Sequence, residues 1–191
     1  TRVTTPTIWD RKKLWRVLKY LNSTPDKVMT VSGDGGQIEI YVDAAFALHP
    51  DAKSHTGVIV KVFGDTVLVK SSKQKIVTRD STEAELVALS DKILIAIRCY
   101  DFLTEQGVTV EVPVVYQDNT STISLVTNGG GKYRNKYIHV RQQVVLQMFR
   151  DGDVKIVHVR TGEMDADVCT KPLQGELGRR MVSRMLGDCI I

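Results

Sequence analysis

The sequence contains no apolar run of the length that a membrane-spanning helix needs, and its first residues show no signal-peptide pattern. It has only three cysteines, widely spaced and without a CxxC pair, which argues against a disulfide framework and a zinc site. The four histidines show no metal-ligand spacing either. We therefore expect a folded protein in a reducing compartment, with no membrane partner and no small-molecule cofactor.

Length and composition are those of a globular protein. The 191 residues suffice for one ordinary domain, or for one domain with an appendage. They are 42% hydrophobic and 25% charged, and the net charge of +4 is compatible with a nucleic-acid partner without requiring one. Because Thr1 is not a natural start residue, we expect the chain to be a fragment or a processed piece of a longer protein.

Hydrophobic periodicity predicts strands first and then helices that alternate with strands, which favours an α/β fold with a mixed sheet and helices on its faces. A hairpin is expected around a turn at Gly64 and Asp65. The predicted helices cover residues 9–21, 81–105, 119–126 and 137–150, with a last helical region from 163 that is interrupted at Pro172 and resumes over 177–186; the predicted strands cover residues 37–43, 58–63, 67–70, 113–117 and 154–159.

Four acidic residues fall at the ends of these predicted elements: Asp43 and Asp118 end strands, while Glu85 and Asp167 begin helices. In open α/β sheets, sites form outside strand ends and at helix starts. Clustered carboxylates repel one another unless protons or cations lie among them, and their oxygens suit Mg²⁺ or Mn²⁺. Two such ions about 4 Å apart can promote phosphodiester hydrolysis.

Each acid also has an ordinary structural interpretation. Asp43 could face water at a strand end, Asp118 could cap a helix, and Glu85 and Asp167 could be exposed helical residues. Glu83 is interpreted as a first-turn acid that the helix dipole favours. Spacing alone does not decide between these interpretations and a metal site.

Five segments carry a family resemblance: YVDAAF, SKQKIVTRDSTEAELVALS, VYQDNTSTI, NKYIHVRQQ and DADVCTKPL. In this order, from about Ile38 to about Leu173, they resemble the ribonuclease H domain of copia-type LTR retrotransposon polyproteins. The stretch WDRKKLWRVLKYLNST resembles the segment that joins the reverse transcriptase to that domain. We therefore expect a connecting segment with one amphipathic helix (1–36), a ribonuclease H-like domain (37–173) and a C-terminal helical tail (174–191).

The resemblance implies the ribonuclease H fold, a five-stranded mixed sheet flanked by helices. It implies hydrolysis of the RNA strand of RNA–DNA hybrids during reverse transcription, with two Mg²⁺ or Mn²⁺ ions as cofactors. The implied partners are the hybrid and the reverse transcriptase domain of the same polyprotein, and the implied location is intracellular, in the cytoplasm or within retrotransposon particles.

The family's four catalytic carboxylates, which are also its metal ligands, match Asp43, Glu85, Asp118 and Asp167. Asp43 is expected to bridge both ions and Asp167 to hold the water-activating ion. Glu83, two residues before Glu85, would point about 200° away on the helix, so it is expected to be a capping acid. Departures from the family pattern stand at Ala45 and Gln143, and the loop before Asp167 lacks the histidine of some cellular enzymes, which leaves His158 as a weak candidate.

An RNA–DNA hybrid is recognised by its shape, phosphates and 2′-hydroxyl groups. Thr82 and Asn119 are candidate donors to 2′-hydroxyl groups, and the other candidate contacts form two mainly basic clusters that could equally be solvated loops. These clusters are Lys73, Gln74 and Lys75 before the long helix, and Lys132, Arg134 and Lys136 after the glycines.

Two other functions are compatible with the sequence. The chain could be a catalytically silent or domesticated module that binds nucleic acid or stabilises reverse transcriptase. It could also be a DNA-processing nuclease of the same fold, although such proteins have different local motifs. The presence of all four acids favours an active ribonuclease H.

Overall fold

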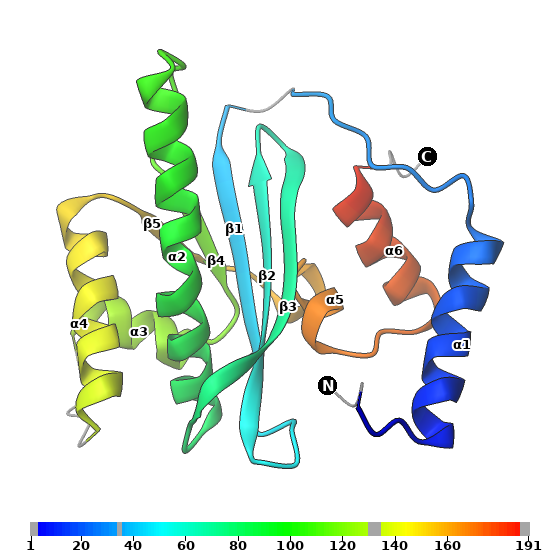
Figure 1. Cartoon of the computed structure of the whole chain (residues 1–191). Helices are drawn as coiled ribbons and strands as arrows, with labels where there is room; N and C mark the ends of the chain where they lie inside the picture. The colour runs from blue at the N-terminus through cyan, green and yellow to red at the C-terminus, as the bar shows by residue number, and fades with distance from the viewer. Residues whose placement is uncertain (1–3, 34–35, 130–134, 188–191) are drawn as a thin grey trace.

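The structure is a computed structural model that describes residues 4–33, 36–129 and 135–187 (Figure 1). Within these ranges, no helix combines the length and apolar character needed to cross a membrane. In chain order the elements are α1 (Ile8–Ser23), β1 (Ile38–Ala45), β2 (Lys53–Val62), β3 (Asp65–Val77), α2 (Ser81–Glu105), β4 (Val114–Gln117), α3 (Thr120–Asn128), α4 (Lys136–Asp151), β5 (Lys155–His158), the 3₁₀ helix η1 (Thr161–Glu163), α5 (Asp167–Thr170) and α6 (Gly175–Leu186).

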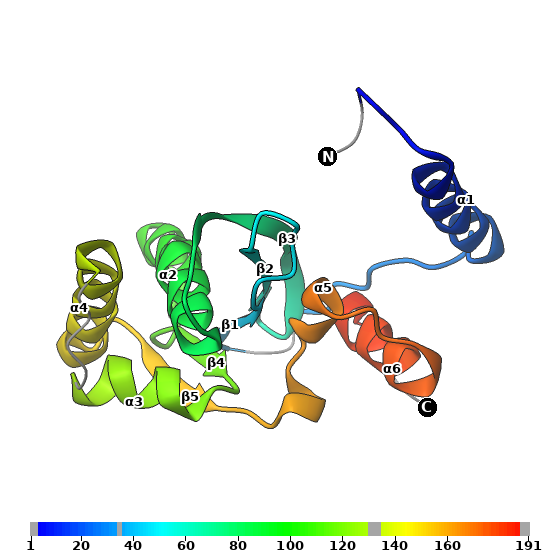
Figure 2. The same ribbon diagram turned by 90° about the horizontal axis from the view of Figure 1, so that it is seen from below.

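The five strands form one mixed sheet in the order β3-β2-β1-β4-β5. β1, β2 and β3 are antiparallel neighbours, whereas β4 runs parallel to both β1 and β5. α2 and α4 lie on one side of the sheet and α5 and α6 on the other (Figure 2). The predicted five-stranded mixed sheet with flanking helices is thus confirmed.

Alternation along β1 separates the two faces of the sheet. Ile38, Ile40 and Val42 point toward α2 and belong to the main hydrophobic core, with Leu86 and Leu89 on the helix side. Tyr41 points the other way, into a smaller core with Ile59, Met164 and Ala166. Because side chains alternate along a strand, Asp43 lies on the Tyr41 face, which is the face that α5 covers.

The hairpin turn between β2 and β3 differs from the prediction. Its central residues are Phe63 and Gly64, both with positive φ (55° and 86°), as a type I′ turn requires. Asp65 instead begins β3, and its carboxylate accepts hydrogen bonds from the N–H groups of Ser32 (2.7 Å) and Gly33 (2.6 Å). The predicted turn at Gly64 and Asp65 was therefore one residue late, and Asp65 anchors the segment that leads into β1.

α2 begins and ends where the periodicity predicted. Asp80 is its N-cap and accepts a hydrogen bond from the N–H of Glu83 (2.8 Å). The carboxylate of Glu83 in turn accepts from the backbone N–H of Arg79 (2.9 Å) and from its guanidinium group. The interpretation of Glu83 as a capping acid is therefore confirmed.

α1 stands apart from the sheet (Figure 2). Thr7 and Asp10 form a capping box at its start, and no residue of the helix is buried. Its large apolar side chains are exposed, including Trp9 (69%) and Trp15 (60%). After the helix, the N–H of Thr30 donates to the carbonyl of Leu186 (2.8 Å), so the segment before β1 contacts the end of α6.

Candidate functional site

Asp43 and Asp118 lie at equivalent positions on neighbouring parallel strands. Tyr41 of β1 pairs with Tyr116 of β4, and their rings stack with centroids 4.6 Å apart. Asp43 and Asp118 each follow two residues later. β1 continues to Ala45, so Asp43 lies inside the strand rather than at its end as predicted, whereas Asp118 directly follows β4. The parallel register therefore brings these two carboxylates together.

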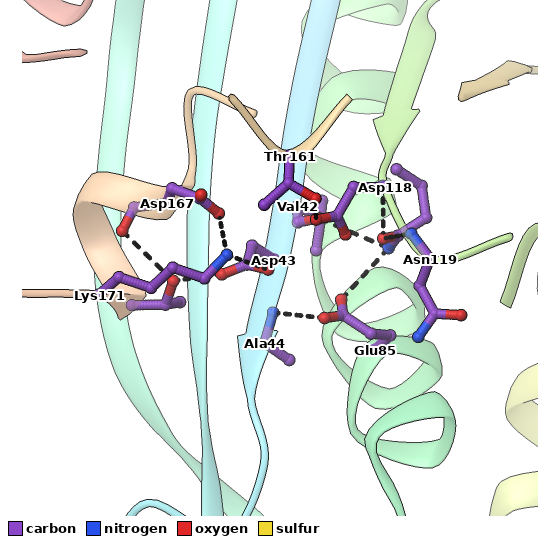
Figure 3. Close-up of polar contacts among 11 residues, drawn as sticks. Val42, Asp43, Ala44, Glu85, Asp118, Asn119, Thr161, Asp167 and Lys171 are labelled. Atoms are coloured by element: carbon purple, nitrogen blue, oxygen red, sulfur yellow. Dashed lines mark hydrogen bonds and ion pairs between the residues drawn. The ribbon is translucent and has the colours of Figure 1, made fainter. Parts of the chain in front are cut away.

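Asp167 joins them from the other end of the chain, as the first residue of α5. One carboxylate oxygen from each of Asp43, Asp118 and Asp167 lies within 4.8 Å of the others (Figure 3). Asp43 and Asp167 are buried (2% and 4% exposed), and Asp118 is half-buried. Three segments distant in sequence thus converge on one acidic group.

Glu85 reaches the same region from α2. Its carboxylate accepts hydrogen bonds from the N–H of Ala44 (3.0 Å) and from Nε2 of Gln117 (3.3 Å). Burial raises the pKa of Glu85 well above its usual value, and the charges of Asp43 and Asp118 raise it further. Among the described residues, the group with oxygens within 4.8 Å comprises the three aspartates, so Glu85 lies beside this group rather than in it.

Gln117 links these acids, and it was not predicted from the sequence. It is fully buried, and its Oε1 accepts hydrogen bonds from the backbone N–H groups of Asp118 (2.8 Å) and Asn119 (3.0 Å). The Nε2 of the same side chain donates a hydrogen bond to the carboxylate of Glu85. One amide therefore orients both the turn that carries Asp118 and the side chain of Glu85. The signal in the sequence is a polar residue that ends an otherwise apolar strand, directly before Asp118.

Three further side chains around the aspartates were also not predicted. Thr170 donates a hydrogen bond to Oδ2 of Asp43, and Thr161 donates to Oδ2 of Asp118 (3.1 Å). The ammonium group of Lys171 lies 2.6 Å from Oδ1 of Asp167 and 3.9 Å from Oδ1 of Asp43 (Figure 3). The segment DVCTK thus supplies an acid, a hydroxyl and a cation to one site.

The electrostatics of the aspartates favour a cation. Burial raises the pKa of Asp43, against the lowering effects of Thr170 and Lys171. Burial also raises the pKa of Asp167 to about 6, against the hydrogen bond from Lys171 and together with the charge of Asp43. Such carboxylates lose their charge easily unless positive charge is added, and carboxylate oxygens are the ligands that Mg²⁺ and Mn²⁺ prefer. The residues present therefore fit a site for these ions.

Sequence comparison finds Pol polyproteins of retrotransposons. The chain is 33% identical over 164 residues to the Retrovirus-related Pol polyprotein from transposon TNT 1-94 of Nicotiana tabacum, which covers 85% of the chain and 12% of that polyprotein. It is 31% identical over 183 residues to the corresponding polyprotein from transposon RE1 of Arabidopsis thaliana, which covers 94% of the chain and 12% of that polyprotein. The chain thus spans only a small part of these relatives, and no protein-family model matches it.

Structural comparison finds the ribonuclease H fold. LC11-RNase H1, isolated from compost by a metagenomic approach, superposes with a TM-score of 0.51 at 20% identity, over 70% of the chain and 92% of that structure. The chain belongs to the Pol polyproteins of retrotransposons, and it has the ribonuclease H fold. The resemblance to the copia-type family and the ribonuclease H fold are both confirmed.

The two aspartates of the MDADV segment lie in different environments. Asp165 is fully buried away from the other acids, with Nζ of Lys61 at 2.6 Å and Nε of Arg184 at 3.0 Å. It therefore joins the segment before α5 to β2 and to α6. Asp167, two residues later, belongs to the acidic group.

The predicted substrate contacts fall in several environments. Lys73 and Lys75 are exposed on β3, where Lys73 pairs with Asp51 (2.7 Å). Gln74 between them is buried, and its Nε2 donates to Oγ1 of Thr56 (3.1 Å) and to the carbonyl of Ala84 (2.9 Å). The expected surface role of Gln74 is corrected accordingly, because its side chain holds β3 to β2 and α2.

Three of the remaining candidates lie at or near the starts of helices. Thr82 is half-buried in the first turn of α2, and Asn119 is the N-cap of α3, where its Oδ1 accepts from the N–H of Thr122 (3.0 Å). Lys136 is exposed at the start of α4, and His158 is exposed at the end of β5. Lys132 and Arg134 lie outside the described residues.

Proposed function

We propose that this domain is a divalent-metal-dependent endonuclease that hydrolyses the RNA strand of RNA–DNA hybrids during retrotransposon reverse transcription. The observation that carries the proposal is the convergence of Asp43, Asp118 and Asp167 within 4.8 Å, beside Glu85, in a ribonuclease H fold. Buried carboxylates at this density are costly without a cation. Hydrolysis of phosphodiesters with bound cations would be a reason to retain these carboxylates.

Asp43, Asp118 and Asp167 would hold Mg²⁺ or Mn²⁺, and Glu85, which lies beside them, is the proposed fourth ligand. Bound ions of this kind activate water and stabilise the leaving oxygen of a phosphodiester. The protein contributes rigid placement. Gln117 fixes Glu85 and the turn at Asp118, and Thr170 fixes Asp43. Positioning of this kind keeps the carboxylates ready for the ions before the substrate arrives.

The substrate would approach on the face of the sheet that carries Asp43. Ala45 of β1 pairs with His55 of β2, and His55 pairs with Lys73 of β3. Directly paired residues point to the same face, and Ala45 shares the face of Asp43 by alternation. Lys73 therefore lies on the same face as the acidic group, where its charge can contact a phosphate. Lys75, Thr82, Asn119 and Lys136 remain proposed contacts, as do Lys132 and Arg134.

A reverse transcriptase domain of the same polyprotein is the proposed protein partner. The relatives are Pol polyproteins of which the chain spans 12% or less in the plant examples, so further domains flank the matching region there. α1 exposes Trp9, Trp15 and other apolar side chains that a neighbouring domain could cover. We place the reaction inside the cell, in the cytoplasm or in retrotransposon particles, where reverse transcription would occur.

The direct test is cleavage of a hybrid labelled on both strands, in Mg²⁺ and in Mn²⁺, by the wild type and by Asp118→Asn. We expect cleavage of the RNA strand alone, reduced at least about 100-fold in the variant. Thermal unfolding of both proteins serves as the control for folding. Stabilisation by the hybrid without any cleavage would instead identify a silent binding module, and preferential cleavage of duplex DNA would identify a different nuclease.

A further inference from the structure

Lys171 places a positive charge among the proposed metal ligands. It directly follows α5 and lies one helical turn after Asp167, and its Nζ is 2.6 Å from Oδ1 of that residue. The same Nζ is 3.9 Å from Oδ1 of Asp43, on the central strand (Figure 3). The ammonium group thus contacts one buried carboxylate and faces a second.

This arrangement goes beyond an ordinary surface ion pair. Pairs four residues apart on a helix are common and weak. Here both acids are at least nine-tenths buried, whereas the side chain of Lys171 is 38% exposed. The neighbouring residue, Thr170, also hydrogen-bonds Asp43. Thr170 and Lys171 therefore hold the end of α5 against β1, and both contact proposed metal ligands.

We infer that Lys171 competes with a divalent ion for the oxygens of Asp43 and Asp167, and that it thereby weakens the affinity of the site for the ion. The inference rests on the metal-dependent function proposed above. A hydrogen bond from the ammonium group uses a lone pair of Asp167 that a metal ligand would need. In addition, a positive charge a few ångströms away repels a dication electrostatically.

The lysine side chain is suited to such an exchange. Its four-carbon stem is flexible, and its partial exposure allows the ammonium group to move into water when an ion takes the carboxylates. Until then the ammonium group offsets the repulsion between Asp43 and Asp167 and keeps α5 in place. Lys171 is thus a positioning residue that acts through these two acids.

Titration calorimetry with Mn²⁺ tests the inference on the wild type, Lys171→Met and Lys171→Arg. Methionine keeps most of the stem and removes the charge, so we expect Mn²⁺ to bind about tenfold more tightly. Arginine keeps the charge and should leave the affinity within about threefold of the wild type. With a chelator present, Lys171→Met should unfold at a lower temperature than the wild type, and Mn²⁺ should raise its unfolding temperature by more.

Asp43→Asn separates this inference from the proposed function. If the wild type and Asp43→Asn bind Mn²⁺ equally tightly, or if neither binds it, the metal site itself is refuted. The proposed competition between Lys171 and the ion is then refuted as well. If Asp43→Asn loses binding but folded Lys171→Met binds Mn²⁺ no more tightly than the wild type, only the inference about Lys171 is overturned. Circular dichroism of each variant shows whether it is folded.

Discussion

Thr170 donates a hydrogen bond to Asp43 across 127 positions of sequence, and both side chains are buried. This contact attaches the short helix α5 to the central strand of the sheet. Asp167 and Lys171 are parts of the same turn, so their places relative to Asp43 depend on it. The acidic site is therefore held by a contact between its two most distant segments.

Thr170→Val removes the hydroxyl and keeps the shape of the side chain. Because Asp43 would lose a buried donor, we expect the free energy of unfolding to fall by about 1–3 kcal/mol. The pKa of Asp43 should also rise further. Urea unfolding measures the first effect, with Thr170→Ser as the matched control that keeps the hydroxyl. Equal stability of the valine and serine variants would show that the hydrogen bond contributes little.

Gln117→Met should loosen the site without removing an acid. The backbone N–H groups of Asp118 and Asn119 would lose their acceptor, and Glu85 would lose a donor. We expect a loss of about 1–3 kcal/mol in the free energy of unfolding, because these buried groups become unpaired. Hybrid cleavage should fall as well. A variant as stable and as active as the wild type would remove the proposed positioning role of Gln117.

The stability of the domain should fall with increasing pH through the titration of Asp167. Its pKa rises from 3.8 in the unfolded chain to about 6 in the folded protein, because of burial. Between these values the folded state binds more protons, so the free energy of unfolding decreases as pH rises. This one group changes the free energy of unfolding by at most about 1.4 kcal/mol per pH unit.

Asp167→Asn is the variant that isolates this contribution. Without Mg²⁺, the stability of this variant should depend less on pH between about 4 and 6 than that of the wild type. Some dependence remains, because the pKa values of Asp43 and Glu85 are also raised and their titration also lowers stability as pH rises. Urea unfolding at several pH values gives both slopes. Identical slopes would mean that Asp167 has the same pKa in the folded and unfolded states.

Gly57→Ala should displace α5. Gly57 pairs with Asp43, and a Cβ atom there would lie 2.7 Å from Cβ of Cys169 and 2.8 Å from the carbonyl oxygen of Ala166. Overpacking of this kind typically costs about 1–3 kcal/mol. We expect lower stability by urea unfolding and reduced hybrid cleavage. Gly36→Ala is the control, since nothing lies within 4 Å of its added Cβ, and a Gly57 variant that behaves like it would contradict the prediction.

The sequence predicted the parts of the site that depend on local pattern. Asp118 follows a short apolar strand and Glu85 begins a long amphipathic helix, so periodicity alone located both at the ends of elements. The resemblance to a known family then selected Glu85 over Glu83. In the structure the carboxylate of Glu83 is bound to Arg79, whereas Glu85 lies beside the three aspartates.

The parts that the sequence did not reveal depend on contacts between distant segments. Nothing local indicates that Thr170 meets Asp43 or that Gln74 turns inward to Thr56. The turn at Phe63 was missed for a different reason: bulky residues rarely adopt positive φ, so the pattern favoured a turn one residue later.

The late position of α5 in the chain has a consequence for synthesis on the ribosome. A nascent chain that has emerged only as far as β5 already contains every strand of the sheet, but it lacks Asp167, Thr170 and Lys171. Contacts with such large sequence separation form only when both partners have been made. The sheet can therefore begin to fold during translation, whereas the acidic site is completed only after α5 has left the exit tunnel.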